Sequence, residues 1–232
     1  MIYAISDLHG LYDRFTKMLE KINFSDNDTL YVLGDIIDRG PDGIKLLQHM
    51  MKQPNIIPIM GNHEYTALSI FKTIRGYTAE QYVMSCDRQY APVLWHWFEA
   101  YGGEPTLDAY EALTDEEQEQ IIEYILKMSP CAKITIRNKT YILVHAGLPV
   151  GANTDNLGFF PPDAFMTVEA DYRKKYFRGA YLVTGHVPTF HIDRSFRGKI
   201  YKKKNHLAID VGAAYGQRMG CICLDTHEEF YV

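Results

Sequence analysis

The chain has 232 residues, of which 47% are hydrophobic and 23% charged, and its formal net charge is −5. This length is enough for a full hydrophobic core, so we expect one domain spanning residues 1–232. The acidic balance gives no bulk attraction to DNA, RNA or an anionic membrane, so none of these is an expected partner.

The cysteines and the chain start bear on cellular location. Residues 1–5 are typical of a strand rather than a signal peptide, and no apolar run reaches membrane-spanning length. No cysteine lies in a CxxC pair, and we expect buried free thiols, which behave as small hydrophobic groups. These observations predict a cytoplasmic, reducing location; the cysteines are Cys86, Cys131, Cys221 and Cys223.

Strands and helices alternate in the first third of the chain. Short apolar runs predict strands at residues 2–6, 29–33 and 56–60, and helical spacing of apolar residues predicts helices at 11–22 and 44–51. This βαβαβ order predicts an α/β fold with a parallel core that helices cover.

The middle of the chain, residues 65–130, is mostly helical in pattern. Thr114 and Glu117 form a capping box, and Pro130 marks the end of that helix. Residues 101–107 form a turn-rich joint that contains Gly102-Gly103, and nearby aromatic residues such as Trp97 are expected to pack within the helices. No linker composition separates this stretch, so we expect a helical cap over the sheet within the same domain.

The last third returns to strands, predicted at 133–136, 140–144, 181–184, 207–209 and 219–224. Asn138-Lys139 is predicted to be the turn of a hairpin. Residues 151–177 are expected to be loop-rich and then helical, and the basic run Lys202–Lys204 is expected to be a solvated hairpin.

Five clusters of metal-ligand and acid-base residues follow predicted strands, where α/β sheets gather their ligands. Carboxylate, amide oxygen and imidazole without thiolate suit Mn, Fe or Zn. The clusters are Asp7-Leu8-His9-Gly10, Gly34-Asp35-Ile36-Ile37-Asp38-Arg39-Gly40, Gly61-Asn62-His63-Glu64, His145-Ala146-Gly147 and Gly185-His186.

This inventory predicts a site for two metal ions with its own general acid. Asp35 can bridge two cations at roughly 3.5–4 Å, and water between them would lose a proton near neutral pH and attack phosphorus. His63 directly follows Asn62, so its side chain diverges from that ligand and is better suited to protonating a leaving group. Asp38 can fix the tautomer of His63, and Arg39 offers a planar fork for phosphate oxygens.

Each cluster alone has an ordinary structural interpretation. The Asp residues of the second cluster can cap turns, and Asn62 can cap a helix. His145 and His186 can be core histidines. Only the ordered recurrence at five strand ends favours a metal site.

With these motifs the chain resembles the phosphoprotein phosphatase family of binuclear metallophosphoesterases. The likeness is to its compact bacterial branch, which includes serine/threonine phosphatases and dinucleoside tetraphosphatases. The resemblance implies a calcineurin-like fold of two packed mixed β-sheets flanked by helices, with a helical cap insertion. It implies that Asp7, His9 and Asp35 hold one metal, and that Asp35, Asn62, His145 and His186 hold the other. His63 with Asp38 would be the acid pair and Arg39 a phosphate ligand.

Two departures from the family pattern stand out. Ser6 replaces the usual glycine before Asp7. The family usually has a second phosphate-binding arginine after the His-Ala-Gly motif, but Glu169 lies near that position here. Arg173 or Arg178 can take its place if the local chain is shifted.

The expected activity is a metal-dependent phosphomonoesterase, of the phosphoserine/phosphothreonine protein phosphatase type. A bis(5'-nucleosyl)-tetraphosphatase is the alternative, and a metal-binding regulatory protein with a weakened site is less favoured. The expected cofactors are two divalent metal ions, Mn²⁺ first, with Fe or Zn as alternatives. The expected partner is a phosphorylated protein or a small phosphoester or nucleotide.

Overall fold

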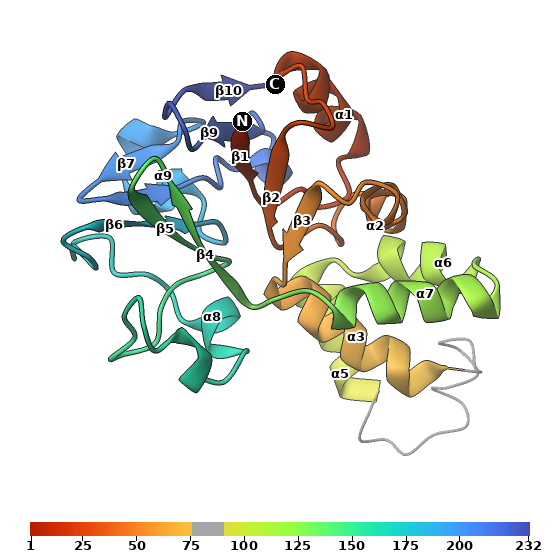
Figure 1. The fold of residues 1–232 in the computed structure, drawn as a ribbon. Helices are drawn as coiled ribbons and strands as arrows, with labels where there is room; N and C mark the ends of the chain where they lie inside the picture. Colours follow the sequence, from red (N-terminus) through yellow and green to blue (C-terminus); the bar gives the residue numbers. More distant parts are fainter. Residues whose placement is uncertain (76–90) are drawn as a thin grey trace.

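The computed structural model describes residues 1–75 and 91–232, so Cys86 lies outside the described residues. Two five-stranded mixed sheets form the centre of the molecule (Figure 1). In the first, with order β10-β9-β1-β2-β3, the three N-terminal strands are parallel and β9 runs antiparallel to β1. Its strands are β1 (Ile2–Ile5), β2 (Thr29–Leu33), β3 (Ile56–Ile59), β9 (Gly220–Cys223) and β10 (Glu229–Tyr231).

The second sheet has the order β4-β5-β6-β8-β7. Its three central strands β5, β6 and β8 are parallel, and the edge strands β4 and β7 are antiparallel to their neighbours. The strands are β4 (Cys131–Ile136), β5 (Lys139–Val144), β6 (Ala180–Thr184), β7 (Tyr201–Lys203) and β8 (His206–Ala208).

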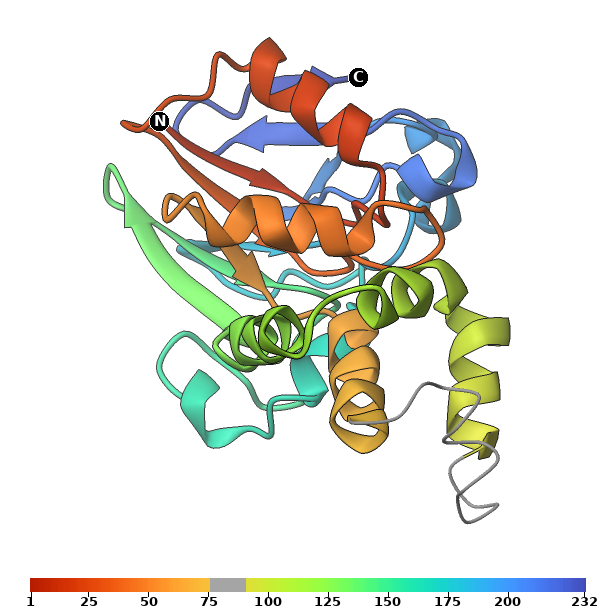
Figure 2. The ribbon, with the colours of Figure 1, turned by 90° about the vertical axis from the view of Figure 1, so that its right-hand side faces the viewer.

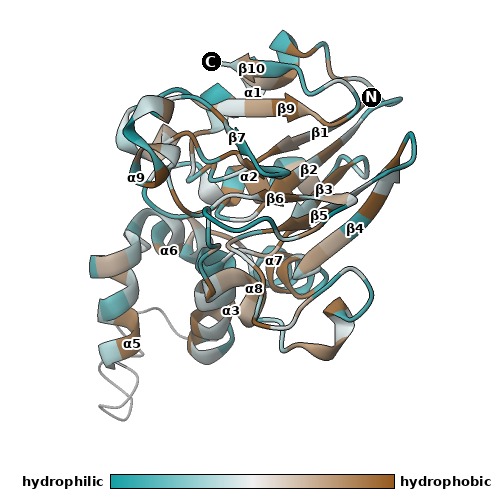
Figure 3. Cartoon of the chain, turned by 90° about the vertical axis from the view of Figure 1, so that its left-hand side faces the viewer, coloured by the Kyte–Doolittle hydropathy of each residue, from teal (hydrophilic) through white to brown (hydrophobic). Residues whose placement is uncertain are grey.

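Alternation along the strands explains how the sheets pack face to face. Ala4 on β1 and Leu143 on β5 point into one shared core between the sheets. Their neighbours Ile5 and Ile142 point into the outer cores, because successive strand side chains face opposite sides. Hydrophobic residues accordingly follow the strands, whereas most connecting loops are hydrophilic (Figure 3). The fold predicted from the resemblance is confirmed.

The helices lie mainly on the outer side of the first sheet, and those of the insertion form one group beside β3 (Figures 1 and 2). This group shares one hydrophobic core with α1 and α2, so the insertion continues the helical layer of the first sheet. The helices are α1 (Tyr12–Lys21), α2 (Gly43–Met51), α3 (Asn62–Ile74), α5 (Ala91–His96), the π-helical turn η1 (Trp97–Tyr101), α6 (Glu104–Glu111) and α7 (Asp115–Leu126).

Helix α7 begins as its sequence predicts. Thr114 Oγ1 accepts a hydrogen bond from the backbone N–H of Glu117 at 3.3 Å, and the Glu117 carboxylate accepts one from the Thr114 backbone at 2.9 Å. The helix ends at Leu126, before Pro130. Both halves of the capping box are therefore present.

Three local predictions differ from the structure. The β4–β5 turn is Arg137-Asn138, with φ of +46° and +66°, so Asn138-Lys139 was one residue late. Both residues have the positive φ that a two-residue hairpin turn of this type requires. Strand β10 was not predicted. Residues 151–177 contain only the short helices η2 (Leu157–Phe159) and α8 (Ala164–Thr167).

The basic run agrees with expectation, and the described thiols agree with it in part. Lys202 and Lys203 lie on β7, which pairs with β8 as a hairpin, and their ammonium groups form ion pairs with Glu229 and Asp193. Cys131, Cys221 and Cys223 are free thiols; Cys221 and Cys223 are buried as expected, whereas Cys131 is only half-buried. None of the described helices combines the length and the apolar character that a membrane crossing requires. The remaining short helices are α9 (Thr189–Ile192), η3 (Arg194–Phe196) and η4 (Ala213–Tyr215).

Candidate metal centre

The five predicted clusters meet at one place, where the carboxyl ends of parallel strands from both sheets converge. Strands β1, β2 and β3 end before Asp7, Asp35 and Asn62, and strands β5 and β6 end before His145 and His186. Within the described residues, two groups of side chains have ligand atoms close enough together to hold a cation, and Asp35 belongs to both.

One group surrounds the ring nitrogen Nε2 of His145. Asn62 Oδ1 lies 2.9 Å from this atom, His186 Nδ1 lies 3.1 Å away and Asp35 Oδ1 lies 3.3 Å away. The other ring nitrogen of His145 is 2.7 Å from the Leu33 carbonyl, which fixes the proton there and leaves a lone pair on Nε2 in the neutral ring. Oxygen and nitrogen lone pairs thus face one another and repel, and a divalent cation between them would turn this repulsion into coordination.

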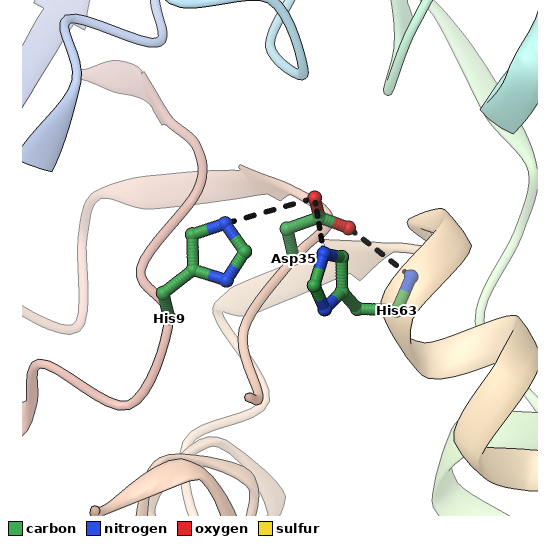
Figure 4. A group of neighbouring side chains, drawn as sticks. All are labelled: His9, Asp35 and His63. Carbon is green, nitrogen blue, oxygen red and sulfur yellow. Dashed lines mark hydrogen bonds and ion pairs between the residues drawn. The ribbon is translucent and has the colours of Figure 1, made fainter. Parts of the chain in front are cut away.

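The second group contains His9, Asp35 and His63 (Figure 4). His9 Nε2 and His63 Nε2 lie 3.8 Å and 3.7 Å from Asp35 Oδ2, so the two rings approach the same oxygen. His9 Nδ1 donates to the Ile37 carbonyl at 3.1 Å, which again leaves the lone pair of Nε2 directed into the site. The two carboxylate oxygens of Asp35 therefore serve different groups.

Asp7 is buried at the same strand ends but belongs to neither group. Its carboxylate oxygens accept the backbone N–H of His186 at 3.2 and 3.0 Å. Burial, with the nearby Asp35 carboxylate, raises the pKa of Asp7 to about 7. The side chain thus joins the first strand of one sheet to the ligand loop of the other.

Burial and neighbouring charges shift the pKa values of the centre in different directions, and burial lowers those of His9 and His186 to about 3 and about 4. Burial opposes protonation of His145, but Asp35 and Asp7 outweigh it and raise the pKa of His145 to about 10. Burial likewise opposes ionisation of Asp35, but His145 and His63 outweigh it and hold its pKa well below the usual range. The negative charge that Asp35 and Asp7 place beside the His145 imidazole would also favour a divalent cation there.

His63 and Asp38 form a close pair next to this centre. His63 Nδ1 lies 2.7 Å from Asp38 Oδ2, and both side chains are buried. Burial lowers the proton affinity of His63, but Asp35 and Asp38 outweigh it and raise the pKa of His63. The pairing places the transferable proton on Nε2, the atom that faces Asp35.

Residues 1–190 match the family model of calcineurin-like phosphoesterases. The chain belongs to this family. The resemblance inferred from the motifs is confirmed.

Relatives in the family carry two different activity names. The chain is 43% identical over 75 residues to the symmetrical bis(5'-nucleosyl)-tetraphosphatase of Wigglesworthia glossinidia brevipalpis, which covers 32% of the chain and 28% of that protein. It is 30% identical over 152 residues to serine/threonine-protein phosphatase 2 of Escherichia coli, covering 64% of the chain and 59% of that protein. These matches thus span less than two thirds of either relative.

Solved structures show the same fold. The crystal structure of a candidate diadenosine tetraphosphatase superposes with a TM-score of 0.69 at 16% identity, covering 100% of this chain and 92% of the other. A metallophosphoesterase from Sphaerobacter thermophilus gives a TM-score of 0.54 at 14% identity, covering 100% and 87%.

The backbone of this family member is strained where the candidate residues lie. Left-handed φ angles cost a non-glycine residue about 1–3 kcal/mol each and persist only where surrounding contacts impose them. Such angles, between +42° and +70°, occur at Asp7, His9, Asp35, Asp38, Arg39 and His186.

Glu64 holds one of the strained loops and was not predicted to do so. Its buried carboxylate accepts four backbone N–H groups: those of Ile36 and Ile37 on one oxygen, and those of Asp35 and Gly61 on the other, at 2.7–3.2 Å. Glu64 is the third residue of α3, and a glutamate there was the available sequence signal.

The three arginines considered for phosphate binding have different positions. Arg39 is exposed, its guanidinium lies 5.1 Å from the ring centroid of Tyr215, and its backbone N–H donates to Gly102. Arg173 is ion-paired to Asp171 at 3.2 Å and, with Glu169, lines a cavity of about 700 Å³ that His186 also borders.

Arg178 lies elsewhere. It precedes β6, whereas His186 follows the same strand, so the structure does not bring Arg178 to the centre. It lines a separate cavity with Lys133 and Tyr176. Of the two alternative arginines, Arg173 thus borders the same cavity as His186, and Arg178 does not.

Proposed function

We propose that this chain is a metal-dependent phosphomonoesterase that acts on phosphoserine and phosphothreonine in proteins. The observation that carries the proposal is the His63–Asp38 pair, 2.7 Å apart, whose free imidazole nitrogen faces the carboxylate shared by two ligand groups. In this proposal, His63 would be a proton donor beside a site for divalent cations.

The metal ligands are part of the same proposal. Asp7, His9 and Asp35 would hold one cation, and Asp35, Asn62, His145 and His186 would hold the other. Mn²⁺ is the favoured ion, with Fe or Zn as alternatives, because the ligands are oxygen and nitrogen atoms without thiolate. When bound, the two cations neutralise phosphate charge and activate a water molecule as the nucleophile.

The acid pair favours an ester substrate. A serine or threonine alkoxide is a poor leaving group and needs a proton as its bond to phosphorus breaks. His63 Nε2–H would supply that proton while Asp38 stabilises the positive ring. Phosphoanhydrides have better leaving groups and depend less on such help.

Arg39 would bind phosphate oxygens. Arg39 is exposed and its guanidinium stands over the Tyr215 ring, so its planar fork of donors would be available to a phosphate. Glu169 offers no such contact, and Arg173 would first have to leave Asp171. Loss of one charge-assisted contact costs about 1.5–3 kcal/mol, so we propose a restricted range of substrates.

A second candidate is the hydrolysis of dinucleoside tetraphosphates. The 43% identity over 75 residues to a symmetrical bis(5'-nucleosyl)-tetraphosphatase favours it. A regulatory protein with a weakened site is a third candidate that the Glu169 departure motivates. A cytoplasmic location, which keeps the described thiols reduced, completes the proposal.

One substrate panel tests these candidates. Protein loaded with Mn²⁺ is assayed on p-nitrophenyl phosphate, a phosphoserine peptide and diadenosine tetraphosphate. We expect the highest kcat/KM on the phosphopeptide, with His63→Ala losing most of it. Preference for diadenosine tetraphosphate would favour the second candidate. Bound metal without turnover of any substrate would favour the regulatory protein.

A further inference from the structure

The π-helical turn η1 carries Trp97, which is completely buried although it belongs to the helical insertion. Its indole Nε1–H donates to Asp38 Oδ2 at 2.7 Å. This is the same oxygen that His63 Nδ1 approaches at 2.7 Å. The Trp97 indole and the His63 imidazole, from different helices, thus share one carboxylate oxygen. Trp97 lies 59 residues after Asp38 in the sequence.

The other oxygen of this carboxylate has no such support. Asp38 Oδ1 is buried and receives no hydrogen bond from the described residues. The orientation of the carboxylate therefore depends on the two bonds to Oδ2. Without the indole, His63 itself would be the remaining partner, and it is the group whose orientation the carboxylate has to fix.

The same insertion holds the strained turn on which Asp38 lies. Thr106 Oγ1 accepts the backbone N–H of Asp38 at 2.9 Å, and the Gly102 carbonyl accepts that of Arg39 at 2.8 Å. Both turn residues have left-handed φ angles, +70° and +67°. The Tyr101 ring contacts the His63 ring edge-on, with centroids 4.7 Å apart.

Gly103 admits the indole to this position. A Cβ at Gly103 would lie 2.2 Å from the Trp97 ring, so only glycine leaves room for it. Gly102 provides the carbonyl for Arg39 in a left-handed conformation, φ +68°. The Gly102-Gly103 joint is therefore explained by the contact between the insertion and the acid pair.

We propose that Trp97 is a positioning residue for the reaction: its indole N–H fixes the Asp38 carboxylate, which in turn orients His63 toward the leaving group. The inference rests on the proposed role of His63 as the general acid. The helical insertion thereby supplies a part of the reaction machinery as well as hydrophobic packing.

The contact can be tested without any activity. The chain has two tryptophans, so indole N–H signals of protein loaded with diamagnetic Zn²⁺ are few, and the exposed Trp95 is an internal reference. We expect Asp38→Asn to shift the Trp97 signal and leave that of Trp95 unchanged. We also expect Trp97→Phe to broaden or remove the His63 Nδ1–H signal. An unchanged His63 signal would overturn the positioning role, even if the protein hydrolysed none of the substrates.

Kinetics then separate positioning from a merely structural role. Trp97→Phe should lower kcat about ten-fold on a phosphoserine peptide, as expected for the loss of one hydrogen bond to a charged group. On p-nitrophenyl phosphate, whose leaving group needs no proton, the loss should stay below about two-fold. In a His63→Ala background, Trp97→Phe should lower kcat no further, because Trp97 affects the rate only through Asp38 and His63.

Two further variants complete the design. Trp95→Phe removes the same atoms from the same insertion and should change neither rate. Gly103→Ala should displace the indole and so lower kcat on the phosphopeptide more than on p-nitrophenyl phosphate, as Trp97→Phe does. It replaces Trp97→Phe in the test if that variant folds poorly. Equal losses on both substrates, or the same fold-loss in the His63→Ala background, would contradict the proposal. Inactivity of the wild-type protein on every substrate would instead count against the proposed function, while the NMR result decides the contact.

Discussion

Among single side chains, Asp35 is the one on which the candidate centre depends. It is buried, and its two oxygens face the two ligand groups. A carboxylate in that position would supply negative charge to both proposed cations, whereas an amide of the same shape would supply none.

Asp35→Asn should therefore remove metal and activity together. We expect metal analysis to find less than half of the wild-type content, and hydrolysis of an aryl phosphate to fall at least 100-fold, the scale of metal-assisted catalysis. Asp26→Asn, on an exposed loop, is the matched control and should change neither quantity. Full metal occupancy in Asp35→Asn would argue against the shared-ligand role.

Glu64 and Glu117 offer a second comparison between residues with the same local setting. Each is the third residue of its helix, but Glu64 is buried beneath the loop that follows β2, whereas Glu117 is only half-buried. Glu64→Gln would put an amide N–H₂ against two backbone N–H groups. We expect the free energy of unfolding in urea to fall by about 1–3 kcal/mol. Glu117→Gln should change the free energy of unfolding little. Equal losses in the two variants would show that the burial of Glu64 does not determine its contribution to stability.

The loops that follow the strands fit together too closely for any side chain at some positions. Gly61 lies between β3 and α3 with an ordinary φ of −97°, so its backbone alone would accept alanine. A Cβ there would nevertheless lie 2.3 Å from Asp35 Oδ1. The glycine in this motif is thus required by the neighbouring loop and not by its own conformation.

Gly61→Ala should displace the Asp35 carboxylate. A shift of about 1 Å at a reacting centre costs on the order of 100-fold in rate, which we expect in steady-state assays with Mn²⁺. Gly158→Ala is the control, because nothing lies within 4 Å of a Cβ at that position. Wild-type activity in Gly61→Ala would show that the carboxylate can move without consequence.

Features whose residues lie close together in the sequence could be predicted from it, and contacts between distant residues could not. The candidate ligands were predicted to meet because each motif is local and each follows a clear apolar strand. Strand β10 was missed because its three residues are all half-buried and show no alternation. The support from Trp97 was missed because it spans 59 residues, and the pairing of an indole with a distant carboxylate leaves no pattern along the chain.

Considered as a whole, the molecule is two sheets joined at the candidate centre. Asp35 and Asn62 come from the first sheet, and His145 and His186 come from the second, so one bound cation would link both sheets. Cations that bind only the folded state stabilise it by mass action, by about 2.7 kcal/mol at 100 times the dissociation constant. The centre should therefore contribute to stability as well as to catalysis.

Removal of metal should lower the midpoint of thermal unfolding of the entire domain. For a chain of this size we expect roughly 5–10 °C between protein saturated with Mn²⁺ and protein treated with chelator, measured by scanning calorimetry. The difference should shrink in Asp35→Asn, which lacks the shared ligand, and should persist in Trp97→Phe, which leaves the ligands in place. Because ligands from both sheets are involved, the unfolding transition should shift as a single unit. A midpoint independent of metal would mean that the buried carboxylates and imidazoles do not hold a cation at all.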